Sequence, residues 1–180
     1  MLEGKRVILR PIDKKDVELF LKWFNDPEVT QYLLFYLPMT RKAEEKWIED
    51  NNLSNSNFIF LIEIKGDKGR PNIPIGNCGL HQISWKDRHA TFGIAIGEKD
   101  YWNNGYGSET SALLLKYGFE VLNLHRISSS VFEFNKRSLK AHQKVGFQIE
   151  GRRRKVFFKR NRYCDEIILG LLKSEWSKRK

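Results

Sequence analysis

The chain has 180 residues, of which 41% are hydrophobic and 30% charged, and its formal net charge is +10. This length and apolar content suit one domain over residues 1–180 with a sizeable core. No stretch approaches the roughly 18 consecutive apolar residues of a membrane span, and residues 1–6 lack the apolar segment of a signal peptide, so we expect a cytoplasmic protein with no membrane segment.

The N-terminal third of the chain alternates between strand-like and helix-like patterns. Apolar residues at helical spacing predict two helices, of which the first is ended by Pro27 and the second is capped by Thr40. Between them, the aromatic and apolar stretch Tyr32–Leu37 is expected either to line a binding site or to pack against the helices. The predicted elements are a strand over 5–10 and helices over 14–24 and 40–51.

The rest of the chain predicts further strands and two more helices. Turns at 65–72 and 86–88 separate the first three of these strands, and Asn135 and Gly146 suit the two ends of the last helix. Because no linker divides the chain, we expect one α/β domain with a mixed sheet. The predicted strands span 58–64, 73–84, 90–97, 127–132, 154–159 and 167–172, and the helices span 108–122 and 135–146.

Residues 100–110, DYWNNGYGSET, place two glycines between a predicted strand and a predicted helix. Gly105 and Gly107 lack Cβ atoms where an anion would approach the backbone, and the helix N-terminus favours negative charge. The string matches neither a P-loop nor a Rossmann fingerprint, because it lacks the Gly-Lys-Ser/Thr of the first and the third glycine of the second. Taken alone, it is equally typical of a plain turn.

A second motif favours the anion-binding interpretation. Residues 135–147, NKRSLKAHQKVGF, resemble the Asn-x-x-Ser/Ala, helix, Gly-Phe pattern of the GNAT N-acetyltransferase superfamily. FGIAIG at 92–97 followed by YWNNGYG at 101–107 resembles that superfamily's pyrophosphate loop. WFNDPEVTQYL at 23–33 and DEIILGLLKSEW at 165–176 resemble its RimJ/RimL-like branch. The resemblance implies an acyl-CoA N-acyltransferase fold, α/β (α+β), with a mixed, mostly antiparallel central sheet flanked by helices.

The resemblance also implies an acetyl-CoA-dependent N-acetyltransferase with acetyl-CoA as co-substrate and no metal. By analogy, one strand offers backbone groups to the pantetheine arm, the loop wraps the pyrophosphate, and one asparagine lies beside the cofactor. Trp102 departs from the pattern, because Gln or Arg is usual at its position. The implied donor-binding residues are Ile94, Ala95 and Ile96 of the strand, Trp102, Asn103, Asn104, Gly105, Tyr106 and Gly107 of the loop, and Asn135.

Several residues are candidates for catalysis. His142 stands seven positions after Asn135, where many members carry a Tyr that protonates the departing thiolate, and the ordinary pKa of histidine suits acid or base work. Ser138 is a rival acid. An acceptor amine must lose a proton before it attacks, and His81 is the first candidate base, with Glu63 and Glu45 as alternatives. Each histidine could equally be a packed residue without a catalytic role.

The resemblance implies that the acceptor is a primary amine, either of a protein N-terminus or of a small molecule such as a polyamine, an amino sugar or an antibiotic. Two other functions stay open: a catalytically weak CoA-binding regulatory protein, and a basic ribosome- or RNA-associated module. The second rests on positive charge at 152–155, 159–160 and 178–180, which is also typical of a solvated surface. Nucleic acid is not expected as the primary ligand, and a homodimer is an open alternative.

The two cysteines, Cys78 and Cys164, stand far apart, with no His or Cys nearby at metal-ligand spacing. We therefore expect two buried free thiols rather than a disulfide, and no zinc site.

Overall fold

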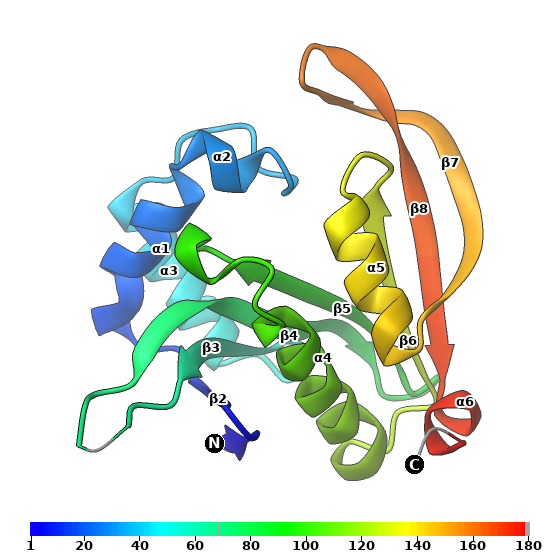
Figure 1. Cartoon of the computed structure of the whole chain (residues 1–180), viewed down its shortest axis with the longest axis horizontal. Coiled ribbons are helices and arrows are strands. Elements are labelled where there is room, and N and C mark those ends of the chain that lie inside the picture. Colours follow the sequence, from blue (N-terminus) through cyan, green and yellow to red (C-terminus); the bar gives the residue numbers. More distant parts are fainter. Residues whose placement is uncertain (68, 179–180) are drawn as a thin grey trace.

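An eight-stranded sheet runs through the computed structural model, which describes residues 1–67 and 69–178 (Figure 1). Two residues of the basic stretch 178–180, Arg179 and Lys180, lie outside this part, as does Lys68 of the predicted turn. The strand order is β1-β2-β3-β4-β5-β6-β8-β7, and of its neighbouring pairs only β5 and β6 are parallel. The expected mixed, mostly antiparallel sheet is therefore confirmed. The strands are β1 Leu2–Glu3, β2 Val7–Pro11, β3 Phe58–Ile64, β4 Ile73–Ser84, β5 His89–Ile96, β6 Arg126–Phe132, β7 Gln148–Lys159 and β8 Arg162–Leu172.

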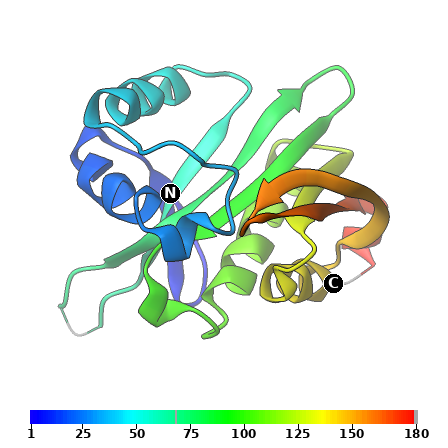
Figure 2. The ribbon, with the colours of Figure 1, turned by 90° about the horizontal axis from the view of Figure 1, so that it is seen from above.

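Helices cover both faces of this sheet, and Figure 2 shows α1 and α3 on one side of the molecule and α5 on the other. Alternate residues of β3 illustrate why: Ile59 and Leu61 pack against α1 and α3, whereas Phe60 and Ile62 belong to the opposite core. This is the period-two alternation of a sheet that is buried on both faces. The helices are α1 Val17–Phe24, α2 Pro27–Thr30, α3 Arg41–Asn52, α4 Tyr106–Lys116, α5 Lys136–Val145 and α6 Lys173–Ser177.

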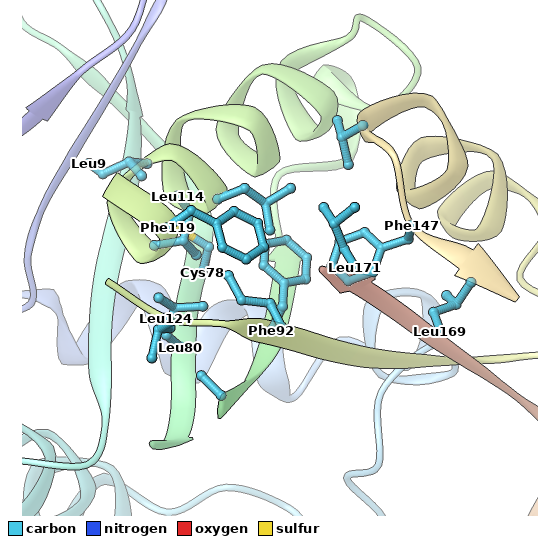
Figure 3. Close-up of a cluster of buried hydrophobic side chains, with 14 of the residues drawn as sticks. Leu9, Cys78, Leu80, Phe92, Leu114, Phe119, Leu124, Phe147, Leu169 and Leu171 are labelled. Atoms are coloured by element: carbon cyan, nitrogen blue, oxygen red, sulfur yellow. The ribbon is translucent and has the colours of Figure 1, made fainter. Parts of the chain in front are cut away.

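The larger core lies between the sheet and α4 and α5. In Figure 3, Leu114 and Phe119 of the α4 region meet Leu80 and Phe92 of the sheet, and all of these side chains are buried. Burial of each such side chain contributes roughly 2 kcal/mol to stability. The core therefore fixes α4, and with it the loop that precedes α4, against β4 and β5.

Two of the helices begin at the caps expected from the sequence. The Thr40 hydroxyl accepts a hydrogen bond from the Ala43 amide, and the Asn135 carboxamide accepts one from the Ser138 amide. Pro27 ends α1 as expected and also opens α2, because proline suits the first position of a helix and Asp26 caps it. These caps set where α3, α5 and α2 meet the sheet.

The last two strands are longer than expected, because β7 begins at Gln148 rather than 154 and β8 at Arg162 rather than 167. Together the two strands form a hairpin whose tip projects beyond the helices at the top of Figure 1. There the strands carry charged pairs instead of alternating apolar residues: Arg152 pairs with Asp165, and Arg153 with Glu166. A pattern of hydrophobic alternation cannot detect such a segment.

The remaining expectations concern membrane segments and thiols. Among the residues that the structure describes, no helix is long and apolar enough to cross a membrane. Cys78 and Cys164 are both buried free thiols, as expected.

Glu44 of α3 is a charged residue in a buried position. Its side chain is 1% exposed, and neither carboxylate oxygen has a hydrogen-bond partner within the described residues. Burial raises the pKa of Glu44 from 4.5 to about 7. The folded protein therefore favours the neutral acid more strongly than the unfolded chain does.

The substitution Glu44→Gln is expected to stabilise the protein near pH 8 by roughly 2–3 kcal/mol and to change its stability little near pH 4. Because the folded pKa lies above the unfolded value, the free energy of unfolding of the wild type falls as the pH rises from 4.5 to about 7. The variant lacks this fall. Urea unfolding at both pH values measures the effect, with Glu45→Gln at the exposed neighbouring position as control. An equal pH dependence in wild type and Glu44→Gln would contradict the prediction.

Candidate active site

The two parallel strands, β5 and β6, separate soon after they meet. They pair only where His89–Thr91 lies beside Arg126–Ser128. Beyond that point β5 stays with β4 and β6 stays with β8. One edge of β5 from Phe92 to Ile96 therefore has no strand partner, and its backbone groups face a gap in the sheet.

This gap is part of a cavity of about 1110 Å³. Five consecutive residues of β5, Phe92 to Ile96, line it. Because successive side chains of a strand point to opposite faces, a cavity lined by all five reaches both faces of the sheet. One end lies on the side of α4 and α5, and the other lies on the side of α1 and α3. Two reactants can therefore meet here from opposite faces.

The glycine loop borders the first of these ends. Gly105 has φ +83° at the start of α4, a left-handed conformation that favours glycine. Arg6, which directly precedes β2, supports the loop from behind, because its guanidinium donates to the Asn104 carbonyl at 3.1 Å and to Glu109 at 2.8 Å. Gly107 has open space where a side chain would stand. The first amides of α4, which have no partner within the helix, are thus accessible to an anion.

The indole of Trp102 bonds within the protein. Its Nε1 donates to the Ile96 carbonyl at 2.7 Å. The guanidinium of Arg137, from the first turn of α5, lies 3.9 Å from the centre of a Trp102 ring and 5.3 Å from that of Tyr32. Burial lowers the pKa of Arg137, and no carboxylate pairs with it in the described part of the chain. The positive charge that position 102 lacks is therefore supplied from α5.

A second cavity, of about 450 Å³, lies behind the same loop and shares Gly105 and Ser108 with the first. Arg6, Glu109 and Lys144 line it; Glu109 is paired with Arg6, and the three side chains together carry a net positive charge. Trp176 of α6 also lines it, and the Trp176 Nε1 atom is buried without a hydrogen-bond partner among the described residues. A cationic pocket with an orphan donor beside a glycine loop fits the phosphates and the base of a nucleotide such as that of CoA.

His142 is 5% exposed, and both of its ring nitrogens have partners. Its Nδ1 lies 2.8 Å from the Ser138 carbonyl, so Nδ1 carries the hydrogen in the neutral ring. Its Nε2 lies 3.0 Å from the Ser129 hydroxyl, which is also 3.1 Å from the Phe92 carbonyl. Burial lowers the pKa of His142, although the bond to Ser138 opposes this. His142 therefore reaches the cavity through Ser129 more than directly.

One hydroxyl hydrogen serves two acceptors in this arrangement. With neutral His142, the hydrogen of Ser129 satisfies either Nε2 or the Phe92 carbonyl. With protonated His142, Nε2 donates to Ser129 and Ser129 donates to Phe92, so the chain of bonds is complete. The group is therefore able to pass a proton between the imidazole and the Ser129 oxygen.

His81 differs from His142, because its ring has no hydrogen bond to any described residue. The ring lies over two glycines paired across β4 and β5: a Cβ built on Gly79 would be 3.0 Å from His81 Nε2, and one on Gly93 would be 3.2 Å from it. Burial lowers the pKa of His81 below 6.5. A neutral imidazole with a free nitrogen thus lines the cavity on the α1 and α3 side.

Some of the other candidate residues line the cavity and others do not. Asn135 and Ser138 line the cavity, and the Ser138 hydroxyl lies 3.4 Å from His142 Nδ1. Glu63 pairs with Arg10 at 2.7 Å, and Glu45 is exposed on α3; neither lines the cavity. The loop residues Asn103, Gly105 and Gly107 border the cavity, whereas Asn104 and Tyr106 do not.

The aromatic segment serves both purposes left open by the sequence. Tyr32 and Phe35 line the cavity, whereas Leu33 also packs on the smaller core. Tyr36 and Leu37 are 86% and 66% exposed. The Lys159 Nζ of the β7–β8 hairpin donates to the Phe35 carbonyl at 2.7 Å and so joins the segment to the hairpin.

Three residues of the site were missed in the sequence. Ser129 shares a strand face with buried Ile127 and Val131, so the alternation of β6 already indicated an inward hydroxyl. Arg137 and Trp176 carried no such signal, because their importance depends on partners distant in the sequence.

Comparison with known proteins finds acetyltransferases in both the family models and the curated relatives. Residues 6–148 match the acetyltransferase (GNAT) domain family. The chain is 31% identical over 180 residues to the uncharacterized N-acetyltransferase p20 of Bacillus licheniformis, with 98% of both chains covered. It is 27% identical to the spermidine N(1)-acetyltransferase of Escherichia coli strain K12, with 98% of this chain and 91% of the relative covered.

Solved structures share the fold. The structure of a Vibrio cholerae spermidine N-acetyltransferase in complex with CoA and spermine matches with a TM-score of 0.88 at 23% identity, covering 97% of this chain and 99% of that one. An acetyltransferase of the GNAT family from Bacillus anthracis matches with a TM-score of 0.82 at 25% identity, covering 97% and 99%.

The bonds of His142 predict a specific tautomer. Because Nδ1 faces the Ser138 carbonyl, we expect nitrogen NMR to show the hydrogen on Nδ1 in the neutral ring, and a pKa below 6.5 because of burial. The variant His142→Gln lacks this ring, so the imidazole nitrogen resonances that disappear from its spectrum belong to His142. A neutral ring protonated on Nε2, or a pKa above 6.5, would show that the hydrogen-bond chain is wrong.

Proposed function

Because the chain belongs to the acetyltransferase (GNAT) domain family, we propose that it transfers the acetyl group of acetyl-CoA to a primary amine by direct attack on the thioester. The observation that carries this proposal is the cavity between β5 and β6, which joins the glycine loop on one face of the sheet to His81 on the other. Donor and acceptor enter from opposite faces and meet at the free edge of β5.

The donor side would hold the anionic part of acetyl-CoA. Amides of the loop from Asn103 to Gly107 and the cation of Arg137 supply positive potential there, and the second cavity offers Arg6 and Lys144. Ile94, Ala95 and Ile96 present the unpaired edge of β5 to the pantetheine arm. When bound, acetyl-CoA supplies the activated acetyl thioester. A backbone amide of this edge is the natural donor to the oxyanion that forms as the amine attacks.

His81 is the proposed base. An amine with a pKa of about 8–10 is protonated at neutral pH and must lose that proton to become a nucleophile. His81 is neutral there, because burial lowers its pKa, and its ring nitrogens have no partner among the described residues. The proton passes from the amine to the imidazole and then to solvent.

The departing thiolate needs a proton as well. Ser129 and Ser138 both place a hydroxyl on the cavity, and Ser129 is backed by His142 at 3.0 Å. We assign the donor role to the Ser129–His142 pair in the form with protonated His142: Ser129 gives its hydroxyl proton to the thiolate, and His142 returns a proton from Nε2 to Ser129, which leaves the ring neutral with its hydrogen on Nδ1. Ser138 keeps its role beside the cap of α5.

Other finer points rest on resemblance. WFNDPEVTQYL and DEIILGLLKSEW support a RimJ/RimL-like subgroup, and names of relatives include polyamine acetyltransferases, so a small amine is the preferred acceptor over a protein N-terminus. A single domain, a cytoplasmic location and a homodimer stay predictions. The RNA-binding alternative gains no support, because Arg152 and Arg153 are engaged with Asp165 and Glu166.

Two glycines with the same backbone conformation allow a matched test of the donor loop. Gly105 and Gly69 have φ of +83° and +82°, so alanine costs each about 1–2 kcal/mol of backbone strain. Gly105→Ala is expected to weaken acetyl-CoA binding at least tenfold, because the loop amides are displaced. Gly69→Ala lies in the 65–72 turn and should bind as the wild type does.

The shift of melting temperature with acetyl-CoA concentration measures the binding of both variants. Wild-type binding by Gly105→Ala would remove the loop from the donor site, and no shift in the wild type would overturn the proposed function.

His81→Gln is expected to lower kcat by about 100-fold or more while the shift of melting temperature with acetyl-CoA is kept. In the wild type, kcat should fall on the acid side with an apparent pKa below 6.5, because protonated His81 cannot accept a proton. This decrease of kcat at acidic pH, the acid limb of the profile, should be absent in His81→Gln. His125→Gln, at an exposed histidine outside the cavity, is the control. If the acid limb persists in His81→Gln, another group is the base.

A further inference from the structure

The acceptor end of the cavity is the end on the side of α1 and α3, and the charges that line it determine how many positive charges a bound amine can carry. Among the described lining residues, the only carboxylate belongs to Glu166. Its side chain is 5% exposed and is paired with Arg153. The cavity therefore has no free anion to offer a cationic substrate.

The acceptor end of the cavity is lined by aromatic and uncharged polar side chains. Trp47 and Asn51 of α3 line the acceptor end, together with Gln82 of β4 and the aromatic rings of Tyr32 and Phe35. The base proposed above, His81, is neutral. These rings and amides suit an aromatic or apolar body, with hydrogen bonds to one amino group.

The surroundings of this end are cationic. Lys159 bonds to the Phe35 carbonyl. Arg160 lies 5.2 Å from the ring centre of Phe134. An ammonium group that enters here loses hydration and meets like charge without a counter-ion, which is unfavourable for each additional charge that a substrate carries.

We propose that the acceptor is a small monoamine with an uncharged aromatic or apolar body, and that the cavity discriminates against polyamines. This inference rests on the proposed acetyl transfer and names its substrate class. A monoamine brings one charge, which it loses to the base before attack. A polyamine keeps further charges that the cavity leaves unpaired.

The test compares 2-phenylethylamine with spermidine as acceptors, with CoA release from acetyl-CoA as the readout and a reaction without amine as the blank. We expect kcat/KM for 2-phenylethylamine to exceed that for spermidine by at least tenfold. Equal or better use of spermidine would overturn the inference and leave acetyl transfer intact. If neither amine is acetylated although acetyl-CoA raises the melting temperature, the substrate class is wrong. If acetyl-CoA causes no rise, the proposed function itself fails.

A substitution tests the electrostatic cause. Gln82 lines the acceptor end, whereas Gln143 is exposed on α5 and lines neither cavity. Gln82→Glu adds a carboxylate of the same shape and should raise the ratio of kcat/KM for spermidine over 2-phenylethylamine several-fold. Gln143→Glu adds the same charge elsewhere and should leave the ratio unchanged. An unchanged ratio in Gln82→Glu, or an equal rise in both variants, would show that the lining charge does not set the preference.

Discussion

The short parallel contact between β5 and β6 is the constraint on which the site depends. A buried backbone amide or carbonyl without a partner is costly, so a sheet rarely leaves an inner strand edge open. Here β5 loses its neighbour after Thr91, and the open edge faces a cavity instead of a strand. The rest of the fold supports this opening, because β4 and β8 hold the two separated strands in place.

The positive charge of the site depends on contacts between distant segments. Trp102 brings no charge to the glycine loop, and its indole instead fixes the loop to the end of β5. The flat ring then supports Arg137 from another helix. A guanidinium stacked between aromatic faces stays available to an anion, since ring contacts leave its N–H donors free. The cation beside the glycine loop thus comes from Arg137 of α5 and not from the loop itself.

The sequence predicted most of the fold because its local signals agree with one another. The caps at Thr40 and Asn135 and the strand-like runs of β3, β4 and β5 with the turns between them place the elements nearly where they are found. The last strand pair was predicted, but its extra residues were not, since charged residues that pair across the strands interrupt the apolar alternation there. In the site, the glycine loop was visible from spacing. The bonds of His142 to Ser129 were not, because their pairing depends on how α5 crosses β6.

Lys159 has a mechanical consequence. Its hydrogen bond to the Phe35 carbonyl tethers the tip of the hairpin to a segment more than 100 positions earlier in the chain. The same Nζ lies 3.4 Å from the Thr30 carbonyl, so a second contact joins the hairpin to the end of α2. The hairpin is thereby joined to the segment Tyr32–Leu37, part of which lines the acceptor end of the cavity. Changes in the hairpin, remote from any reacting atom, can therefore retune which amines this end admits.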